Sequence, residues 1–188
     1  MAILHIRLIG DPVLRTPAAP VTDFGPELEK LVADMTETMN DVAGVGLAAP
    51  QIGVSLQVFT YAIGDAQGHV INPTIINSAE LQGSGAEGCL SVPGLGFPAP
   101  RFEHSVVRGF DLHGEPVTVE GTGYLARCLQ HETDHLNGTL FIDRLEGTDR
   151  KNAMRSIRQA DYSGITAQTN DLRARTVASS FGGLGGTA

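Results

Sequence analysis

The sequence contains no tryptophan, few other aromatic residues and only two cysteines, Cys89 and Cys128. It also has no apolar run close to the roughly 20 residues that a membrane-crossing helix needs. The first residues lack the basic and then apolar layout of a secretory signal, so we expect a cytoplasmic protein with no membrane partner. Thiols stay reduced in the cytoplasm, which argues against a disulfide between the two cysteines.

Positive charge is scarce over most of the chain. The formal net charge is −8, which argues against direct binding to DNA or RNA as the main activity. The charges are uneven, however, because residues 1–143 carry 6 basic and 17 acidic side chains, whereas residues 144–188 carry 7 basic and 4 acidic ones. A basic end of this kind is typical either of a segment that docks on an anionic partner or of a solvated amphipathic helix.

Hydrophobic periodicity predicts three helices and a β region between the first two of them. The helices are expected over residues 26–43, 124–137 and about 147–161. Strands or strand pieces, separated by glycine turns, are expected over residues 56–63, 69–76, 103–112 and 116–120. This order of elements indicates an α+β protein.

The expected fold has antiparallel or mixed β-sheets packed around a central buried helix, with one helix near each end of the chain. The central helix is residues 124–137, whose apolar residues lie on more than one side of the helix axis. The length suits one domain, so we expect a single catalytic domain over residues 1–162. Residues 163–188 lose periodicity and end in glycines, which predicts a flexible C-terminal tail.

The segment QHETDHLNG at 130–138 contains an HExxH pattern formed by His131, Glu132 and His135. On a helix, residues four apart lie one above the other, so both imidazoles can bind one metal ion. Glu132 points about 100° around the axis from His131 and can reach a metal-bound water. The pattern therefore predicts a metal site with two histidine ligands and a glutamate that handles protons.

Two histidines leave this site one short of the three protein ligands that catalytic zinc sites usually have. The long zinc-protease pattern requires a third histidine at a position that is Phe141 here, and no glutamate follows at a suitable distance. Asp143 and Asp149 remain possible downstream ligands. We nevertheless expect the third ligand upstream, where a cysteine is the natural candidate.

The two cysteines are not equivalent as candidates for that ligand. Cys128 lies seven residues before His135, about 10 Å along a helix, so one ion cannot easily be bound by both. We therefore interpret Cys128 as apolar lining beside the site. Cys89 lies on a separate segment, EGCLSVP at 87–93, and can approach the helix from across the site. Cys89 is the predicted third ligand.

Three segments together resemble the signature motifs of the peptide deformylase family. They are GVGLAAPQ (44–51), EGCLS (87–91) and QHETDHLNG (130–138), in the order and with separations similar to those of the family. HExxH alone is shared with many metalloproteases, whereas the three motifs together are specific. The resemblance covers roughly residues 3–160.

The resemblance implies a ferrous iron, replaceable by zinc, nickel or cobalt, held by Cys89, His131 and His135. It implies an enzyme of the bacterial cytoplasm that removes the formyl group from the N-terminal N-formylmethionine of newly synthesised proteins. In such an enzyme a metal-bound hydroxide attacks the formyl carbon. Glu132 would take the proton from the water and then deliver it to the departing amine.

The resemblance also implies roles for residues outside the metal site. The backbone N–H of Leu90 and the side-chain amide of Gln51 would stabilise the negative charge that develops on the formyl oxygen. Gly46 would offer backbone hydrogen bonds to the substrate peptide. Three residues are expected to line an apolar pocket for the methionine: Val45, Tyr124 and Cys128.

Further charged residues lie near the motifs or in the basic end of the chain. Glu87, Arg101 and Asp134 are expected to form a network behind the metal ligands. Surface ion pairing is the alternative for Arg101. Some family members are thought to sit near the ribosomal exit tunnel, and one group of residues makes ribosome association conceivable here: Arg144, Arg150, Lys151, Arg155 and Arg158.

Three other functions remain open from the residues alone. A metallopeptidase would cut ordinary peptide bonds, although Phe141 breaks the commonest pattern of that class. A non-catalytic metal-binding module would use four protein ligands and leave no position for water. A hydrolase with Cys89 as its nucleophile would stay active in the presence of a chelator.

Overall fold

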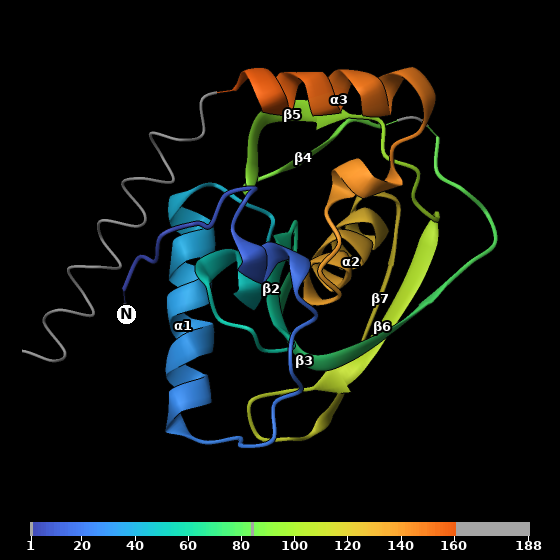
Figure 1. The fold of residues 1–188 in the computed structure, drawn as a ribbon. Helices are drawn as coiled ribbons and strands as arrows, with labels where there is room; N and C mark the ends of the chain where they lie inside the picture. The colour runs from blue at the N-terminus through green and yellow to red at the C-terminus, as the bar shows by residue number, and fades with distance from the viewer. Residues whose placement is uncertain (1, 84, 161–188) are drawn as a thin grey trace, which may run out of the picture.

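Three α-helices are found in the part of the chain that the structure describes, residues 2–83 and 85–160 of a computed structural model (Figure 1). They are α1 (Pro26–Asp41), α2 (Gly123–Leu136) and α3 (Gly147–Gln159). Each begins within a residue or two of the predicted position. The expected C-terminal tail, residues 163–188, lies outside the described residues.

The strands form two antiparallel sheets within residues 2–83 and 85–160. The larger sheet has five strands in the order β1-β2-β3-β6-β7, and the smaller one pairs β4 with β5. The strands are β1 (Gly46–Ala48), β2 (Val58–Ile63), β3 (Ala66–Asn77), β4 (Glu87–Cys89), β5 (Val92–Phe97), β6 (His104–Phe110) and β7 (Pro116–Thr122). The expected α+β class, with antiparallel sheets and three helices, is confirmed.

The described part of the chain also contains three short 3-10 helices, which lie at points that matter for the site. They are η1 (Pro12–Arg15), η2 (Ala49–Ile52) and η3 (Phe141–Arg144). The helix η2 follows β1 directly, and η3 follows the turn after α2. Among the helices described, none is long and apolar enough to span a membrane.

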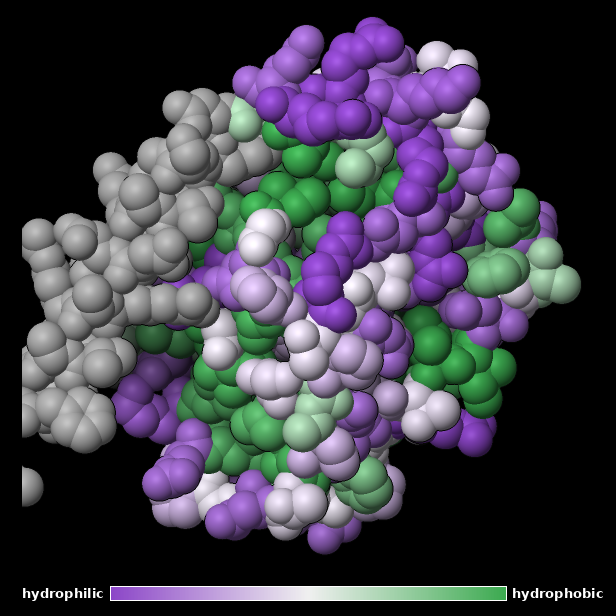
Figure 2. Space-filling view, in the orientation of Figure 1, coloured by the Kyte–Doolittle hydropathy of each residue, from purple (hydrophilic) through white to green (hydrophobic). Residues whose placement is uncertain are grey.

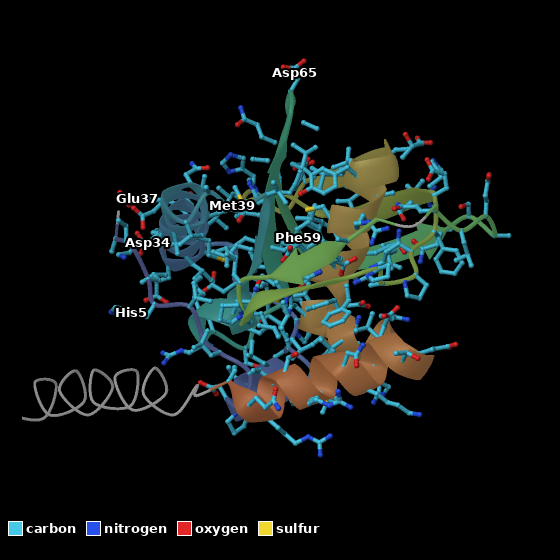
Figure 3. The ribbon with its side chains drawn as sticks, turned by 90° about the horizontal axis from the view of Figure 1, so that it is seen from above. His5, Asp34, Glu37, Met39, Phe59 and Asp65 are labelled. Atoms are coloured by element: carbon cyan, nitrogen blue, oxygen red, sulfur yellow. The ribbon has the colours of Figure 1, made fainter. Side chains whose placement is uncertain are left out.

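Helix α1 packs an apolar face on the larger sheet. Its buried residues include Val32, Met35 and Met39, which share a core cluster with Val58 of β2. Burying each such side chain contributes about 1.5–3 kcal/mol relative to leaving it exposed. Seen along α1, Met39 points toward the sheet, whereas Asp34 and Glu37 lie on the other side of the helix (Figure 3).

Helix α2 is buried along most of its length. All residues from 126 to 136 are buried, and the helix contacts β1, β2, β3, β6, β7 and η2. Figure 1 shows it between the smaller sheet and the larger one. Several of these buried residues are charged or polar, and burying such groups is costly unless they have partners. The partners of the α2 side chains therefore locate the functional site.

Candidate metal centre

Cys89, His131 and His135 lie together although they come from two different elements. Cys89 ends β4, and the two histidines lie four residues apart on α2. The Cys89 Sγ is 3.3 Å from the His135 Nε2, which is itself 3.2 Å from the His131 Nε2. All three ligand atoms lie within 4.8 Å of one another. Cys128 is not part of this cluster.

The chemistry and spacing of these three donors fit one metal ion. Tetrahedral bonds of 2.0–2.3 Å place neighbouring ligand atoms roughly 3.3–3.8 Å apart, close to the separations seen here. The His131 Nδ1 donates a hydrogen bond of 2.6 Å to the Glu87 carboxylate, and the Nε2 of the same ring faces the cluster. A thiolate with two imidazoles suits a borderline divalent cation.

Glu87 is held by three cationic or proton-donating side chains. Arg101 donates to both carboxylate oxygens, through Nε at 2.9 Å and Nη2 at 2.6 Å, and Arg127 donates through Nη1 at 3.0 Å. Burial would raise the pKa of Glu87, but the hydrogen bonds from Arg101 and His131 and their charges lower it to about 2. Glu87 is therefore an anion that fixes the His131 ring.

The expected network of Glu87, Arg101 and Asp134 is present. Besides its bonds to Glu87, Arg101 donates through Nη1 to the Asp134 Oδ2 at 2.6 Å. The Arg101 side chain is only 2% exposed, so surface ion pairing does not describe it. These buried charges satisfy one another, which buried ionic groups require in a folded protein.

Glu132 lies beside the cluster with its carboxylate only partly satisfied. The residue is buried, and within residues 2–83 and 85–160 its Oε2 has no hydrogen-bond partner. Burial is the main cause that raises the pKa of Glu132 to about 7. A bound divalent cation would lower this pKa and favour the ionised carboxylate, which is the form that can accept a proton.

Gly46 of β1 lies directly against Glu132. A Cβ added at Gly46 would overlap the Glu132 carboxylate and would lie 2.9 Å from the Cys128 Sγ. Real Cβ atoms do not approach other atoms this closely, so only glycine fits unless the glutamate moves. The glycine-rich segment at 44–51 is therefore needed for close packing at the site and is more than a simple turn.

Gln51 points into the site from η2. It is 1% exposed, and its Oε1 accepts a hydrogen bond from the Ala48 N–H at 2.9 Å. Its Nε2 donates to the Ser91 Oγ at 3.3 Å and to the Cys89 Sγ at 3.8 Å. The amide is thus oriented, with its N–H groups directed toward Ser91 and Cys89.

A cavity of about 640 Å³ opens over the cluster. It brings together predicted site residues from three segments: Val45, Gly46, Gln51, Cys89, Leu90, Tyr124, Cys128, His131 and Glu132. Of the three predicted pocket residues, Cys128 is buried, whereas Val45 is 37% and Tyr124 is 58% exposed. His135 does not line this cavity and lies deeper, at 1% exposure.

Two residues of the site did not emerge from the sequence. Ser91 is fully buried and orients the Gln51 amide. Arg127, whose direction the sequence did not give, is buried and also donates to the Gln82 Oε1 and the Ala99 carbonyl oxygen. Arg127 lies four residues before His131 on α2, and this spacing on one helix face was the available signal.

Comparisons with known proteins agree with this geometry. A family model described as polypeptide deformylase matches residues 3–151. The chain is 58% identical over 168 residues to the peptide deformylase of Acidothermus cellulolyticus, a match that covers 89% of this chain and 93% of that protein. It is 56% identical over 164 residues to the peptide deformylase of a Parafrankia species, which covers 87% and 90% of the two chains.

Solved structures give the same result. A crystal structure of a peptide deformylase from Legionella pneumophila superposes with a TM-score of 0.79 at 42% identity, over 88% of this chain and 98% of that one. A peptide deformylase from Synechococcus elongatus, crystallised with actinonin, gives a TM-score of 0.78 at 37% identity, over 86% and 89% of the two chains. Since the family model spans residues 3–151, this chain belongs to the polypeptide deformylase family.

Proposed function

We propose that this enzyme removes the formyl group from the N-terminal N-formylmethionine of newly synthesised proteins, in a metal-dependent hydrolysis. The observation that carries the proposal is the arrangement of three metal-ligand atoms and one incompletely bonded carboxylate at the base of a single cavity. Family membership supports the same reaction. The substrate partner is therefore a nascent N-formylmethionyl peptide.

Cys89, His131 and His135 would hold the metal ion, with α2 as the central scaffold of the site. When bound, the cation would lower the pKa of a water molecule and polarise the formyl oxygen. We propose ferrous iron, for which zinc, nickel or cobalt can substitute, because the thiolate suits such cations. Metal analysis of protein purified without oxygen tests this choice, and zinc in large excess over iron would contradict it.

Glu132 would move the proton in this reaction. Its carboxylate would accept the proton of the attacking water and then deliver it to the departing amine. The position of Glu132 supports both steps, because burial favours uptake of the proton whereas a bound cation favours its release. Its buried and incompletely bonded Oε2 would face the water.

The neighbouring segments would stabilise and orient the substrate. The Gln51 amide and the Leu90 backbone N–H would donate hydrogen bonds to the oxygen that gains negative charge, each contributing about 3–4 kcal/mol. The backbone of Gly46 would bind the substrate peptide. The methionine side chain would occupy the part of the cavity lined by Val45 and Cys128, with Tyr124 at its exposed edge.

Formate release from matched peptides tests the proposed function. The enzyme should release formate from an N-formylmethionyl peptide and should leave the N-acetyl and unmodified forms of the same peptide intact. A chelator should abolish the activity, and added divalent metal should restore it. Cleavage of internal peptide bonds would favour a metallopeptidase, chelator-resistant turnover would favour Cys89 as a nucleophile, and metal binding without turnover would favour a binding module.

We further propose that residues 1–162 form the catalytic unit and that it works at the ribosome in the bacterial cytoplasm. The surface over α3 is hydrophilic (Figure 2), and four exposed basic residues belong to this helix: Arg150, Lys151, Arg155 and Arg158. Their charge complements ribosomal RNA. Reversing these four charges should reduce co-sedimentation with ribosomes while formate release from a free peptide stays unchanged. Unchanged co-sedimentation would refute the docking idea.

A further inference from the structure

Arg144, at the end of η3, forms a bidentate ion pair with Asp134 of α2. Its Nε donates to the Asp134 Oδ2 at 3.1 Å and its Nη2 to the Oδ1 at 2.5 Å. The Arg144 side chain is 48% exposed, whereas that of Asp134 is 9% exposed. Paired hydrogen bonds of this kind fix the orientation of a carboxylate as well as neutralising it.

The contact begins a continuous line of charged groups that ends at a metal ligand. Asp134 accepts from Arg101, Arg101 donates to Glu87, and Glu87 accepts from the His131 Nδ1. The buried members of the line have side-chain exposures between 2% and 11%. Arg144 is the member that reaches solvent.

Without Arg144, the negative charge of Asp134 would be unfavourable at its position in the helix. It is two residues from the C-terminal end of α2, where the partial negative charge of the helix end disfavours a carboxylate. In the intact line, two guanidinium groups share this carboxylate. Without Arg144, Arg101 would be the remaining cation bonded to Asp134, and a buried anion draws its remaining cation closer.

Arg101 donates hydrogen bonds to two carboxylates, so a change at one carboxylate can alter its bonds to the other. Its Nη1 serves Asp134, while its Nε and Nη2 serve Glu87. A shift of the guanidinium toward Asp134 would lengthen its bonds to Glu87. Glu87 sets the ring orientation of His131, so the change would reach the Nε2 that faces the other ligands.

This effect would not pass through the substrate cavity. A separate cavity of about 150 Å³ is lined by Arg101, Asp134 and Arg144, together with Gln130 and Thr133 of α2. The substrate cavity is lined by His131 and Glu132, on another face of the same helix. Arg144 can therefore act on the metal site without touching the substrate.

We propose that Arg144 is a positioning residue, which holds His131 in its metal-binding orientation through Asp134, Arg101 and Glu87. The inference rests on the proposed metal site and adds to it a residue outside the three motifs. Substitution of a direct partner of a metal-bound histidine typically lowers metal affinity about 10–100-fold. Arg144 is further away and half exposed, so we expect a smaller effect, of about three- to tenfold.

The experiment measures the release of Ni²⁺ from the loaded protein to a chromogenic chelator. Arg144→Ala should release nickel about three- to tenfold faster than the wild type. The release rate of Arg144→Lys should lie between these two rates. The lysine ammonium group keeps the positive charge but cannot form the paired hydrogen bonds of the planar guanidinium group. Each metal-free protein should unfold in urea in one cooperative transition, which shows that the fold is intact. The midpoint of Arg144→Ala should be lower than that of the wild type, because Asp134 loses one of its two cations.

Arg15→Ala is the matched control. Arg15 is 42% exposed and pairs with Asp143, the neighbour of Arg144, so the substitution removes one guanidinium from an adjacent ion pair outside the line. Loss of positive charge alone would tighten cation binding in both variants. Faster release in Arg144→Ala alone would support positioning. Release from Arg144→Ala that is no faster than from the wild type, or equally fast release from both variants, would overturn it.

The same measurements separate this inference from the proposed function. A wild-type protein that binds no nickel, or that binds it and releases no formate from formylated peptides, would overturn the proposed function. A wild type that does both, beside an Arg144→Ala variant that behaves like Arg15→Ala, would overturn only the role of Arg144.

Discussion

Glu132→Gln should lower kcat for formate release by about 10²–10⁴-fold while the bound metal content stays at the wild-type level. Glutamine keeps the size of the side chain in its buried position but cannot take a proton from water. The three proposed metal ligands, Cys89, His131 and His135, are unchanged by the substitution. Metal analysis and a formate assay on the same preparation measure the two effects.

Glu120→Gln provides the control for this substitution. Glu120 is an exposed glutamate of β7 that contacts His104, on a different element from α2. Its change to glutamine should leave both turnover and metal content unchanged. Turnover in Glu132→Gln within tenfold of the wild type would mean that another group moves the proton. Loss of metal from Glu132→Gln would mean that the glutamate is needed for binding.

Arg101→Met should destabilise the protein by about 3–5 kcal/mol, the range for removal of one partner from a buried ionic group. The substitution leaves Glu87 with Arg127 and Asp134 with Arg144, each with one cation fewer. Two buried carboxylates would then be incompletely compensated. Urea unfolding of the metal-free protein measures the change in the free energy of unfolding without a contribution from metal binding.

Arg108→Met is the control, which tests whether the loss of an arginine outside the buried network also destabilises the protein. Arg108 lies on β6 and is exposed, so its removal should change the free energy of unfolding by less than about 0.5 kcal/mol. A similarly small change in Arg101→Met would show that the network contributes little to stability. Its role would then be limited to orienting His131.

Sequence periodicity and spacing predicted the helices and the proximity of Cys89, His131 and His135. The helix over Pro26–Asp41 follows from regular apolar residues between a proline and a glycine, both of which act locally. The distance of one helical turn between His131 and His135 is fixed by helix geometry alone. For this reason both imidazoles could be assigned to one site without knowledge of the rest of the fold.

The strands nearest the site could not be predicted in the same way. β1 and β4 have three residues each and contain glycine, so they are too short to show an alternating pattern. They are defined by the strands that pair with them, β2 for β1 and β5 for β4. Likewise, the directions of Arg127 and Arg144 depend on which carboxylates the folded chain brings within reach, and no local pattern carries that information.

The shortness of β4 has a consequence for how the enzyme acquires its activity. Glu87 and Cys89 are two residues apart on this strand, and both contact histidines of α2, Glu87 at His131 and Cys89 at His135. A slip of one residue in the pairing with β5 would turn both side chains away together. A molecule with this slipped pairing would lose the Cys89 sulfur from the proposed metal site and, with Glu87, the group that orients His131. We therefore do not expect folding intermediates that bind the metal with only part of the site.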